Sequence, residues 1–208
     1  MRLIYRLFAV FAFVLASSAA AADDTQAGEK AYGSCVACHG VSGEGIAAMN
    51  SPALAGQGEA YLVRQLNNFR AGIRGTDPAD TTGMQMRGMA ATLADETAVA
   101  NVAAYLASLP VPVTAEDTAG ANMRNGENEY NGACGACHGG KAQGNASLSA
   151  PRLAGLGSAY LKRQYQNFAS GVRGTHPDDR LGQQMKMMST MLASENDLDD
   201  VLAFIGIQ

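Results

Sequence analysis

Apolar residues recur along most of this chain at the three- and four-residue spacing that is typical of amphipathic helices. Residues 59–70 and 158–169 show this spacing, and Gly72 and Gly171 follow them, so we expect two helices that end before these glycines. A further stripe of this kind lies near the end of each half of the chain: Val99, Val102, Ala103 and Leu106, then Leu198, Val201, Leu202 and Ile205.

Two more helices are expected over 27–35 and 126–134, and the glycine-rich stretches between these segments show no strand pattern. The sequence therefore predicts an all-α fold with long loops. Because so much loop leaves each half with a thin core, we expect a metal, a disulfide or a cofactor to stabilise it.

The first residues have the pattern of a secretory signal rather than of folded protein. Arg2 and Arg6 flank an apolar run over 7–16, and small residues up to Ala22 follow it. An uncleaved anchor is disfavoured, since a spanning helix needs about 20 apolar residues and two serines interrupt this run. We predict a signal peptide over 1–22, cleavage after Ala22 and export to the periplasm.

The remaining chain is a tandem duplication. A shift of 99 positions places "SPALAG" on "APRLAG" and "YLVRQLNNFRAGIRGTDP" on "YLKRQYQNFASGVRGTHP" without a gap. Pro110 and Pro112 end the preceding helix and stiffen a short connection. The predicted organisation is an N-terminal domain over 23–109, a linker over 110–119 and a C-terminal domain over 120–208.

The net charge argues against nucleic acid as a partner. The formal charge is −4, and it falls to −6 when the two arginines of the signal are removed. A mildly acidic, exported protein is a poor binder of nucleic acid.

All four cysteines stand in two copies of one motif, "CVACH" with Cys35 and Cys38 and "CGACH" with Cys134 and Cys137. A disulfide between cysteines three apart closes a tiny loop and leaves the following histidine unexplained. A zinc site lacks a fourth ligand near each copy, and a thioredoxin-like pair needs a βαβ setting. Covalent attachment of haem c explains the cysteines and the histidine together, so two haems are predicted.

His39 and His138, directly after the second cysteine of each motif, are the expected proximal ligands of iron. A distal ligand that both halves need should recur at the 99-residue shift. Among the ten methionines this filter leaves two pairs, and both precede the C-terminal helix of their half. We select the first pair as ligands and assign the second to the lining of the pocket: Met86 with Met185, and Met89 with Met188.

With these residues in place, the sequence resembles the dihaem class I cytochromes c, specifically the cytochrome c4 family, over nearly all of the chain after the signal. The resemblance rests on the two CxxCH motifs, on the "YLVRQLNNFRAG" and "YLKRQYQNFASG" segments, and on "MQMRGMAATLADE" and "QQMKMMSTMLASEND". It implies two tandem class I domains, each made of a few helices wrapped around a covalent haem. In that family the axial methionine lies seven residues before a leucine, which here also selects Met86 and Met185.

The resemblance also implies that the carbonyls of Pro52 and Pro151 accept a hydrogen bond from the histidine ring. Arg74 and Arg173 recur in both copies and are candidates for pairing with haem propionates, with a solvated loop position as the equal alternative. One departure from the repeat is that the approach to the first motif is one residue shorter, from Tyr32 against Tyr130. Another is the extra Met187 beside Met188 in the second copy.

Histidine–methionine ligation leaves iron no open site, which favours electron exchange over oxygen chemistry. We therefore predict a periplasmic one-electron carrier, not an enzyme, between a quinol-oxidising complex or dehydrogenase and a terminal oxidase or reductase. Peripheral association with the membrane is compatible with this role, and the sequence leaves the oligomeric state open. One alternative is a dihaem subunit of a larger enzyme such as a flavocytochrome sulfide dehydrogenase. A second is a dihaem peroxidase, in which one iron must be open.

Overall fold

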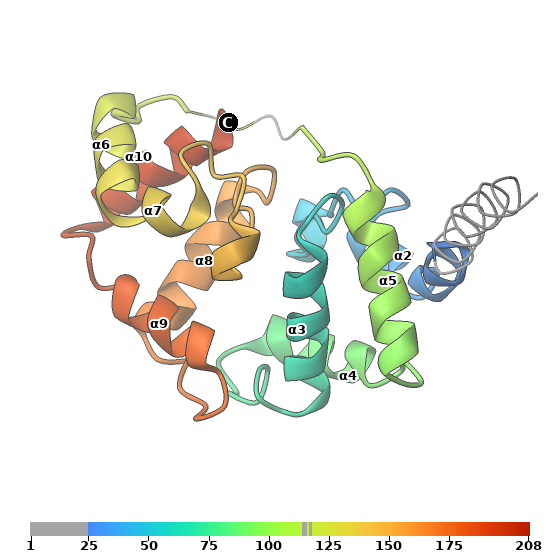
Figure 1. Cartoon of the computed structure of the whole chain (residues 1–208). Coiled ribbons are helices and arrows are strands. Elements are labelled where there is room, and N and C mark those ends of the chain that lie inside the picture. Colours follow the sequence, from blue (N-terminus) through green and yellow to red (C-terminus); the bar gives the residue numbers. More distant parts are fainter. Residues whose placement is uncertain (1–24, 114–115, 117) are drawn as a thin grey trace, which may run out of the picture.

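The computed structural model describes residues 25–113, 116 and 118–208. The predicted signal over 1–22 and part of the predicted linker lie outside the described residues. The described chain forms two helical lobes joined by the segment after residue 108, which Figure 1 shows passing across the top of the molecule. Within the described residues there are helices, short turns and two isolated bridges but no strand, which agrees with the all-α prediction.

The N-terminal half begins with helical residues 25–32 and continues with the short α2 (Val36–His39) and the 3-10 helix η1 (Ala47–Met49). Three longer helices complete it: α3 (Glu59–Arg70), α4 (Thr81–Ala90) and α5 (Glu96–Ser108).

The C-terminal half repeats this order. It consists of α6 (Met123–Ala133), α7 (Gly135–His138), the 3-10 helix η2 (Ala146–Leu148), α8 (Ser158–Ala169), α9 (Arg180–Met188) and α10 (Glu195–Gly206). Helices α3 and α8 have the bounds predicted from their apolar stripes. Helix α6 begins three residues before the prediction and ends one residue before it, and the described part of the first helix ends at residue 32 rather than 35.

Helices α4 and α9 were not predicted, because the methionine segments carry two glycines or a run of glutamine and lysine without a clear apolar stripe. Each begins at a buried aspartate whose carboxylate accepts a hydrogen bond from the backbone N–H three residues later. The distances are 2.9 Å for Asp80 and Gly83, and 3.0 Å for Asp179 and Gly182. An aspartate in this position satisfies a backbone donor that the helix leaves free, and its negative charge suits the helix N-terminus.

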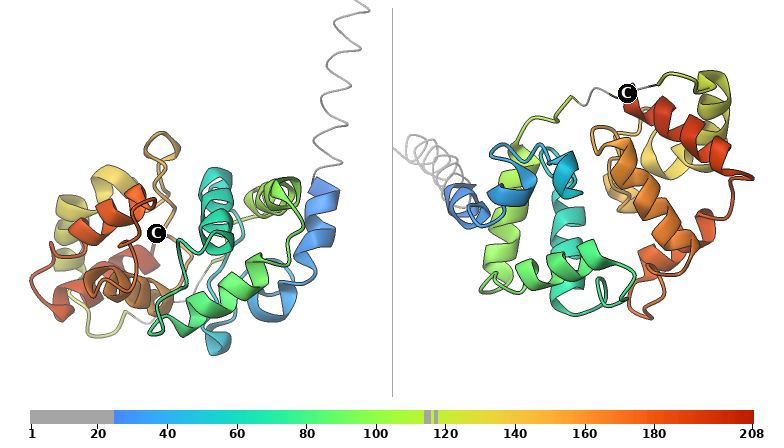
Figure 2. Two further views of the ribbon diagram at one scale, coloured as in Figure 1. Left: turned by 90° about the horizontal axis from the view of Figure 1, so that it is seen from below. Right: turned by 180° about the vertical axis from the view of Figure 1, so that it is seen from behind.

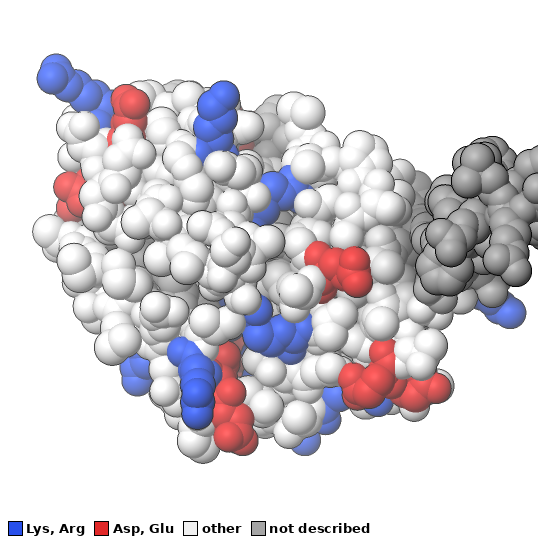
Figure 3. All heavy atoms as spheres, viewed as in Figure 1, with Lys and Arg blue, Asp and Glu red and all other residues white. Residues whose placement is uncertain are grey.

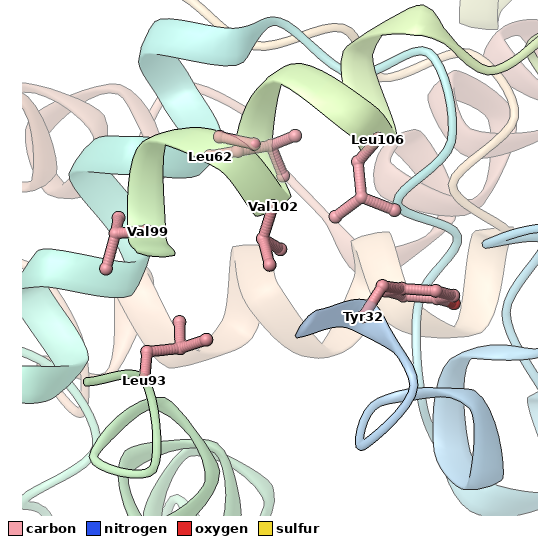
Figure 4. Packing of buried hydrophobic residues seen from close by; sticks show 7 residues of the cluster. Tyr32, Leu62, Leu93, Val99, Val102 and Leu106 are labelled. Atoms are coloured by element: carbon pink, nitrogen blue, oxygen red, sulfur yellow. The ribbon is translucent and has the colours of Figure 1, made fainter. Parts of the chain in front are cut away.

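The first and last helices of each half cross in close contact. A Cβ atom at Gly126 of α6 would lie 2.1 Å from the carbonyl oxygen of Asp200 in α10, and one at Gly28 would lie 2.1 Å from that of Asn101 in α5. The crossing therefore requires glycine. In the N-terminal half it brings Tyr32 against the inner face of α5, as Figure 4 shows, and the buried cluster there comprises Tyr32, Leu62, Leu93, Val99, Val102, Ala103 and Leu106.

Replacing Gly126 with alanine is expected to destabilise the C-terminal half by about 1–3 kcal/mol, since the new methyl group must push α6 away from α10. Thermal unfolding measured by far-ultraviolet circular dichroism tests this. Gly132→Ala in the same helix is the matched control, because a Cβ there meets nothing within 4 Å and alanine favours helix. Equal melting temperatures for the two variants would contradict the close crossing.

The two halves meet through α3 and α8, which face each other in all the views of Figures 1 and 2. Two hydrogen bonds join the buried Gln57 and Arg152. Gln57 Nε2 donates to the Arg152 carbonyl, and the backbone N–H of Arg152 donates to Gln57 Oε1, both at 2.9 Å.

Among the described residues no helix is long and apolar enough to cross a membrane. On the face drawn in Figure 3, basic and acidic side chains are interspersed across a largely uncharged surface.

Candidate cofactor sites

A tight helical turn displays the two cysteines of each motif and the histidine behind them. In the N-terminal half the N–H groups of Cys38 and His39 both donate to the Cys35 carbonyl, at 3.1 and 2.9 Å. Gly40 then ends the turn at φ +82°, where a Cβ would overlap the carboxylate of Glu44. The bonds recur in the C-terminal half, where Cys137 and His138 donate to Cys134 and Gly139 ends the turn. None of the four cysteines forms a disulfide.

A buried tyrosine braces each turn from the preceding helix. The hydroxyl of Tyr32 donates to the Gly40 carbonyl and that of Tyr130 to the Gly139 carbonyl, both at 2.6 Å. Burial raises the pKa of Tyr32 well above its ordinary range and that of Tyr130 to about 12, so both hydroxyls keep their proton. The segment between this tyrosine and the first cysteine is one residue longer in the C-terminal half, yet the same tyrosine–glycine hydrogen bond forms in both halves.

The axial candidates His39 and His138 are buried, and a proline carbonyl fixes each ring. The Nδ1 atom lies 2.9 Å from the Pro52 oxygen in one half and 2.8 Å from the Pro151 oxygen in the other. Burial lowers the pKa of both imidazoles, and the bond to the proline carbonyl offsets this in part. A neutral ring whose Nδ1–H donates to a carbonyl presents an unprotonated Nε2, which is the form that binds a metal.

In the C-terminal half the motif opens into a cavity that α8, α9 and α10 enclose. Cys134, Cys137 and His138 lie on its wall together with Pro151 and Met185. Further lining comes from apolar and aromatic side chains, namely Leu153, Leu161, Tyr165, Phe168, Leu192 and Val201. Two thiols, one imidazole and one thioether around an apolar cavity are the set of groups that hold a covalent haem, so the residues present fit the predicted cofactor.

The methionine helices place the remaining ligand candidates. Met185 and Met188 both line the cavity, whereas Met187 is 68% exposed. In the N-terminal half Met86 is half-buried, and Met89 is 40% exposed. Residues three apart in a helix share a face, so each pair from the repeat filter presents two thioethers on one side of α4 or α9.

Arg74 and Arg173 are buried between the halves rather than solvated. Arg74 donates to Gln65 Oε1 at 2.7 Å and across the boundary to Gln164 Oε1 at 2.9 Å. Arg173 makes the reciprocal bonds to Gln164 and Gln65, both at 2.7 Å. These acceptors are neutral amides, and the Nε atom of each arginine has no hydrogen-bond partner among the described residues. Arg173 also lines the C-terminal cavity.

The tyrosine at the same boundary reports the local positive potential. Burial alone would raise the pKa of Tyr61, but the nearby guanidiniums of Arg173 and Arg74 outweigh it and lower that pKa below its ordinary value.

Sequence reasoning missed the residues that connect the two halves, chiefly Gln57, Arg64, Arg152 and Arg163. Arg64 and Arg163 carried a signal, since both recur at the 99-residue shift within "YLVRQ" and "YLKRQ". No repeat signal marked Gln57 or Arg152, because the residues at the corresponding positions of the other half are Leu156 and Ala53.

Comparison with known proteins agrees with this geometry. The family model described as cytochrome c matches twice, over residues 25–110 and 123–206. The chain is 33% identical over 184 residues to cytochrome c4 of Azotobacter vinelandii, with 85% of each chain covered. It is 36% identical over 197 residues to a thiosulfate dehydrogenase electron acceptor of Stutzerimonas stutzeri, covering 88% of this chain and 87% of that protein.

Among solved structures, reduced recombinant cytochrome c4 from Pseudomonas stutzeri superposes with a TM-score of 0.72 at 31% identity. The match covers 88% of this chain and 97% of that one, so it extends over both halves. Two covalently bound haems follow from the paired domains and their two Cys-x-x-Cys-His motifs. The chain therefore belongs to the cytochrome c family and is a dihaem electron carrier of the cytochrome c4 type.

Proposed function

We propose that this protein carries single electrons in the periplasm, from a quinol-oxidising complex or a dehydrogenase to a terminal oxidase or reductase. Four cysteines hold the two haems covalently: Cys35 and Cys38 in the domain over 23–109, and Cys134 and Cys137 in the domain over 120–208. The axial ligands are His39 with Met86 and His138 with Met185. The observation that carries the proposal is the pair of equivalent histidine–proline contacts, which leaves one free imidazole nitrogen in each half.

Each bound haem supplies one iron that alternates between ferric and ferrous states. In this proposal the residues of the chain leave the iron without an open coordination position. The proline carbonyls keep the imidazoles oriented, and the thioethers of Met86 and Met185 would supply the second protein ligand of each iron, which would favour the ferrous state and leave no position for oxygen or peroxide. Electron exchange without bond making is the chemistry that such a site supports.

Arg74 and Arg173 are proposed to face the haem propionates at the boundary between the halves. The two buried guanidiniums donate to neutral amides, and the Asp80 carboxylate acts on Arg74 alone of the pair, so a further carboxylate would balance the remaining positive charge. The unpartnered Nε atoms and the position of Arg173 on the cavity wall support this assignment.

One relative suggests a specific class of donor. The similar protein of Stutzerimonas stutzeri is named as the electron acceptor of thiosulfate dehydrogenase, so a dehydrogenase of sulfur compounds is a candidate donor for this chain. The alternative of a permanent subunit, as in a flavocytochrome sulfide dehydrogenase, is distinguished by purification from the periplasm. A free carrier elutes alone, whereas a subunit elutes with a flavoprotein.

Visible spectroscopy with haem quantification tests the central proposal. We expect two haems per chain, low-spin spectra in both redox states, and the weak far-red band of a sulfur–iron bond in the oxidised protein. The reduced protein should not bind carbon monoxide, because both irons lack an open position. Carbon monoxide binding or peroxide turnover by the unaltered protein would favour a dihaem peroxidase, and a colourless or zinc-containing protein would refute the proposal.

A further inference from the structure

The boundary between the halves contains a reciprocal pair of arginine contacts. Arg64 of α3 donates through Nη2 to the carbonyl of Ser149 at 2.9 Å, and Arg163 of α8 donates through Nη2 to the carbonyl of Asn50 at 2.7 Å. The donors are related by the 99-residue repeat, and so are the acceptors. Each half therefore binds the same carbonyl position of the other half.

The carbonyls that accept these bonds belong to residues with unfavourable backbone geometry. Asn50 has φ +56° and Ser149 has φ +54°, the left-handed region that is rare for residues other than glycine, although asparagine adopts it more readily than serine. Each sits in a small loop closed by an isolated bridge, from Ile46 to Ser51 in one half and from 145 to 150 in the other. A loop of this kind keeps its shape when neighbouring groups hold it.

The carbonyls that orient the axial histidines belong to the residues that directly follow these loops. Pro52 lies two residues after Asn50, and Pro151 lies two residues after Ser149. Their oxygens accept the bonds from Nδ1 of His39 and His138. The arginine of one half is thus connected to the imidazole of the other half through three consecutive residues, the last of which directly follows the bridge that closes the loop.

Aromatic packing holds the side chains of Arg64 and Arg163 in addition to their Nη2 hydrogen bonds. The Arg64 guanidinium lies 5.3 Å from the centre of the Tyr61 ring, and that of Arg163 lies 5.5 Å from the centre of the Tyr160 ring. The Nε atoms of both arginines are buried without a hydrogen-bond partner among the described residues. Contact with the aromatic ring fixes the guanidinium in front of the loop carbonyl.

From these contacts we propose that Arg64 and Arg163 are positioning residues that act across the boundary, each on the axial histidine of the other half. The inference rests on the proposed assignment of His39 and His138 as iron ligands. When the arginine holds the loop, the proline carbonyl stays within hydrogen-bond distance and keeps the imidazole basic. Without it the loop relaxes, the bond to Nδ1–H weakens, and the less basic ligand favours the ferrous state.

The test is to replace Arg64 with leucine in the holoprotein and to follow both histidines by nuclear magnetic resonance in the reduced state. We expect the Nδ1–H of His138 to exchange with solvent at least several-fold faster, while that of His39 keeps its rate. Arg64 also lines the C-terminal cavity, so removing its positive charge acts on the potential of that haem directly, and the exchange rates are the deciding readout. Arg163→Leu should give the mirror image, with the Nδ1–H of His39 exchanging faster.

Two further variants separate positioning from general loosening. Arg64→Lys keeps a donor toward Ser149 and should restore most of the slow exchange at His138. Arg70→Leu removes another guanidinium from α3, one paired with the exposed Glu96 within the same half, and should leave both histidines unchanged.

Equal effects of Arg64→Leu in both halves, a larger effect on His39, or no effect would overturn the proposal while both haems remain bound. If Arg64→Leu does not fold, Arg163→Leu decides: faster exchange at His39 with an unchanged rate at His138 supports the proposal, and any other pattern overturns it. If the unaltered protein lacked two histidine-bound haems, the axial assignment itself would be wrong.

Discussion

Replacing Cys134 and Cys137 together with alanine is expected to yield a protein with one covalent haem per chain, held by the N-terminal half. Both thiols line the C-terminal cavity beside His138, and the repeat supplies no other cysteine to that half. Haem quantified per chain, with haem staining after denaturing electrophoresis of the two halves separated by proteolysis, measures the loss.

The same variant should lose most of the stability of its C-terminal half. The buried cluster there comprises Tyr130, Ala142, Ala154, Val201 and Ile205, of which two are alanines. A core of this size rarely supplies more than about 3–5 kcal/mol, and the aromatic and aliphatic side chains that line the cavity would lose their partner. We expect thermal unfolding in two steps, with the altered half melting first.

The mirror variant, with Cys35 and Cys38 replaced, is the control for independence of the halves. It should keep the C-terminal haem and lose the N-terminal one. Two haems per chain in either double variant would mean that the cysteines are not the points of attachment. A total loss of haem from either would mean that the halves do not load independently.

Sequence patterns were sufficient wherever one face of a helix is buried and the other exposed. Helices α3 and α8 have the predicted bounds, because an apolar stripe marks the buried face of each helix and a glycine marks its C-terminal end. Helices α4 and α9 were missed because their segments carry two glycines or a run of glutamine and lysine without a clear apolar stripe. Their capping aspartates, Asp80 and Asp179, become recognisable as helix starts only in the structure.

The boundary between the halves could not be predicted, because the spacing of residues along a helix does not say which face meets another domain. The arginines at 74 and 173 illustrate this. The sequence left them between a solvated loop and a haem pocket, and the structure places them at the boundary, bonded to glutamines of both α3 and α8. Recurrence in both copies indicated that they matter, but their partners lie about ninety or more residues away.

Replacing Met185 with alanine is expected to open the distal side of the C-terminal haem. Reduced protein should then bind one carbon monoxide per chain, and the far-red sulfur–iron band should fall to about half. The potential of that haem should drop by on the order of 0.1 V, since axial ligands tune haem potentials over about 0.8 V and thioether ligation raises them. Carbon monoxide titration and redox titration of the visible spectrum measure both effects.

Met188→Ala is the matched control, because Met188 also lines the cavity and lies one turn further along α9. Two thioethers separated by about 4.5 Å along a helix cannot both occupy one axial position. The N-terminal half favours Met86, since Met86 is half-buried while Met89 is 40% exposed, and a ligand to iron is withdrawn from water. Because the two halves are copies of one domain, the same choice applies to Met185, and carbon monoxide binding by Met188→Ala alone would reverse it.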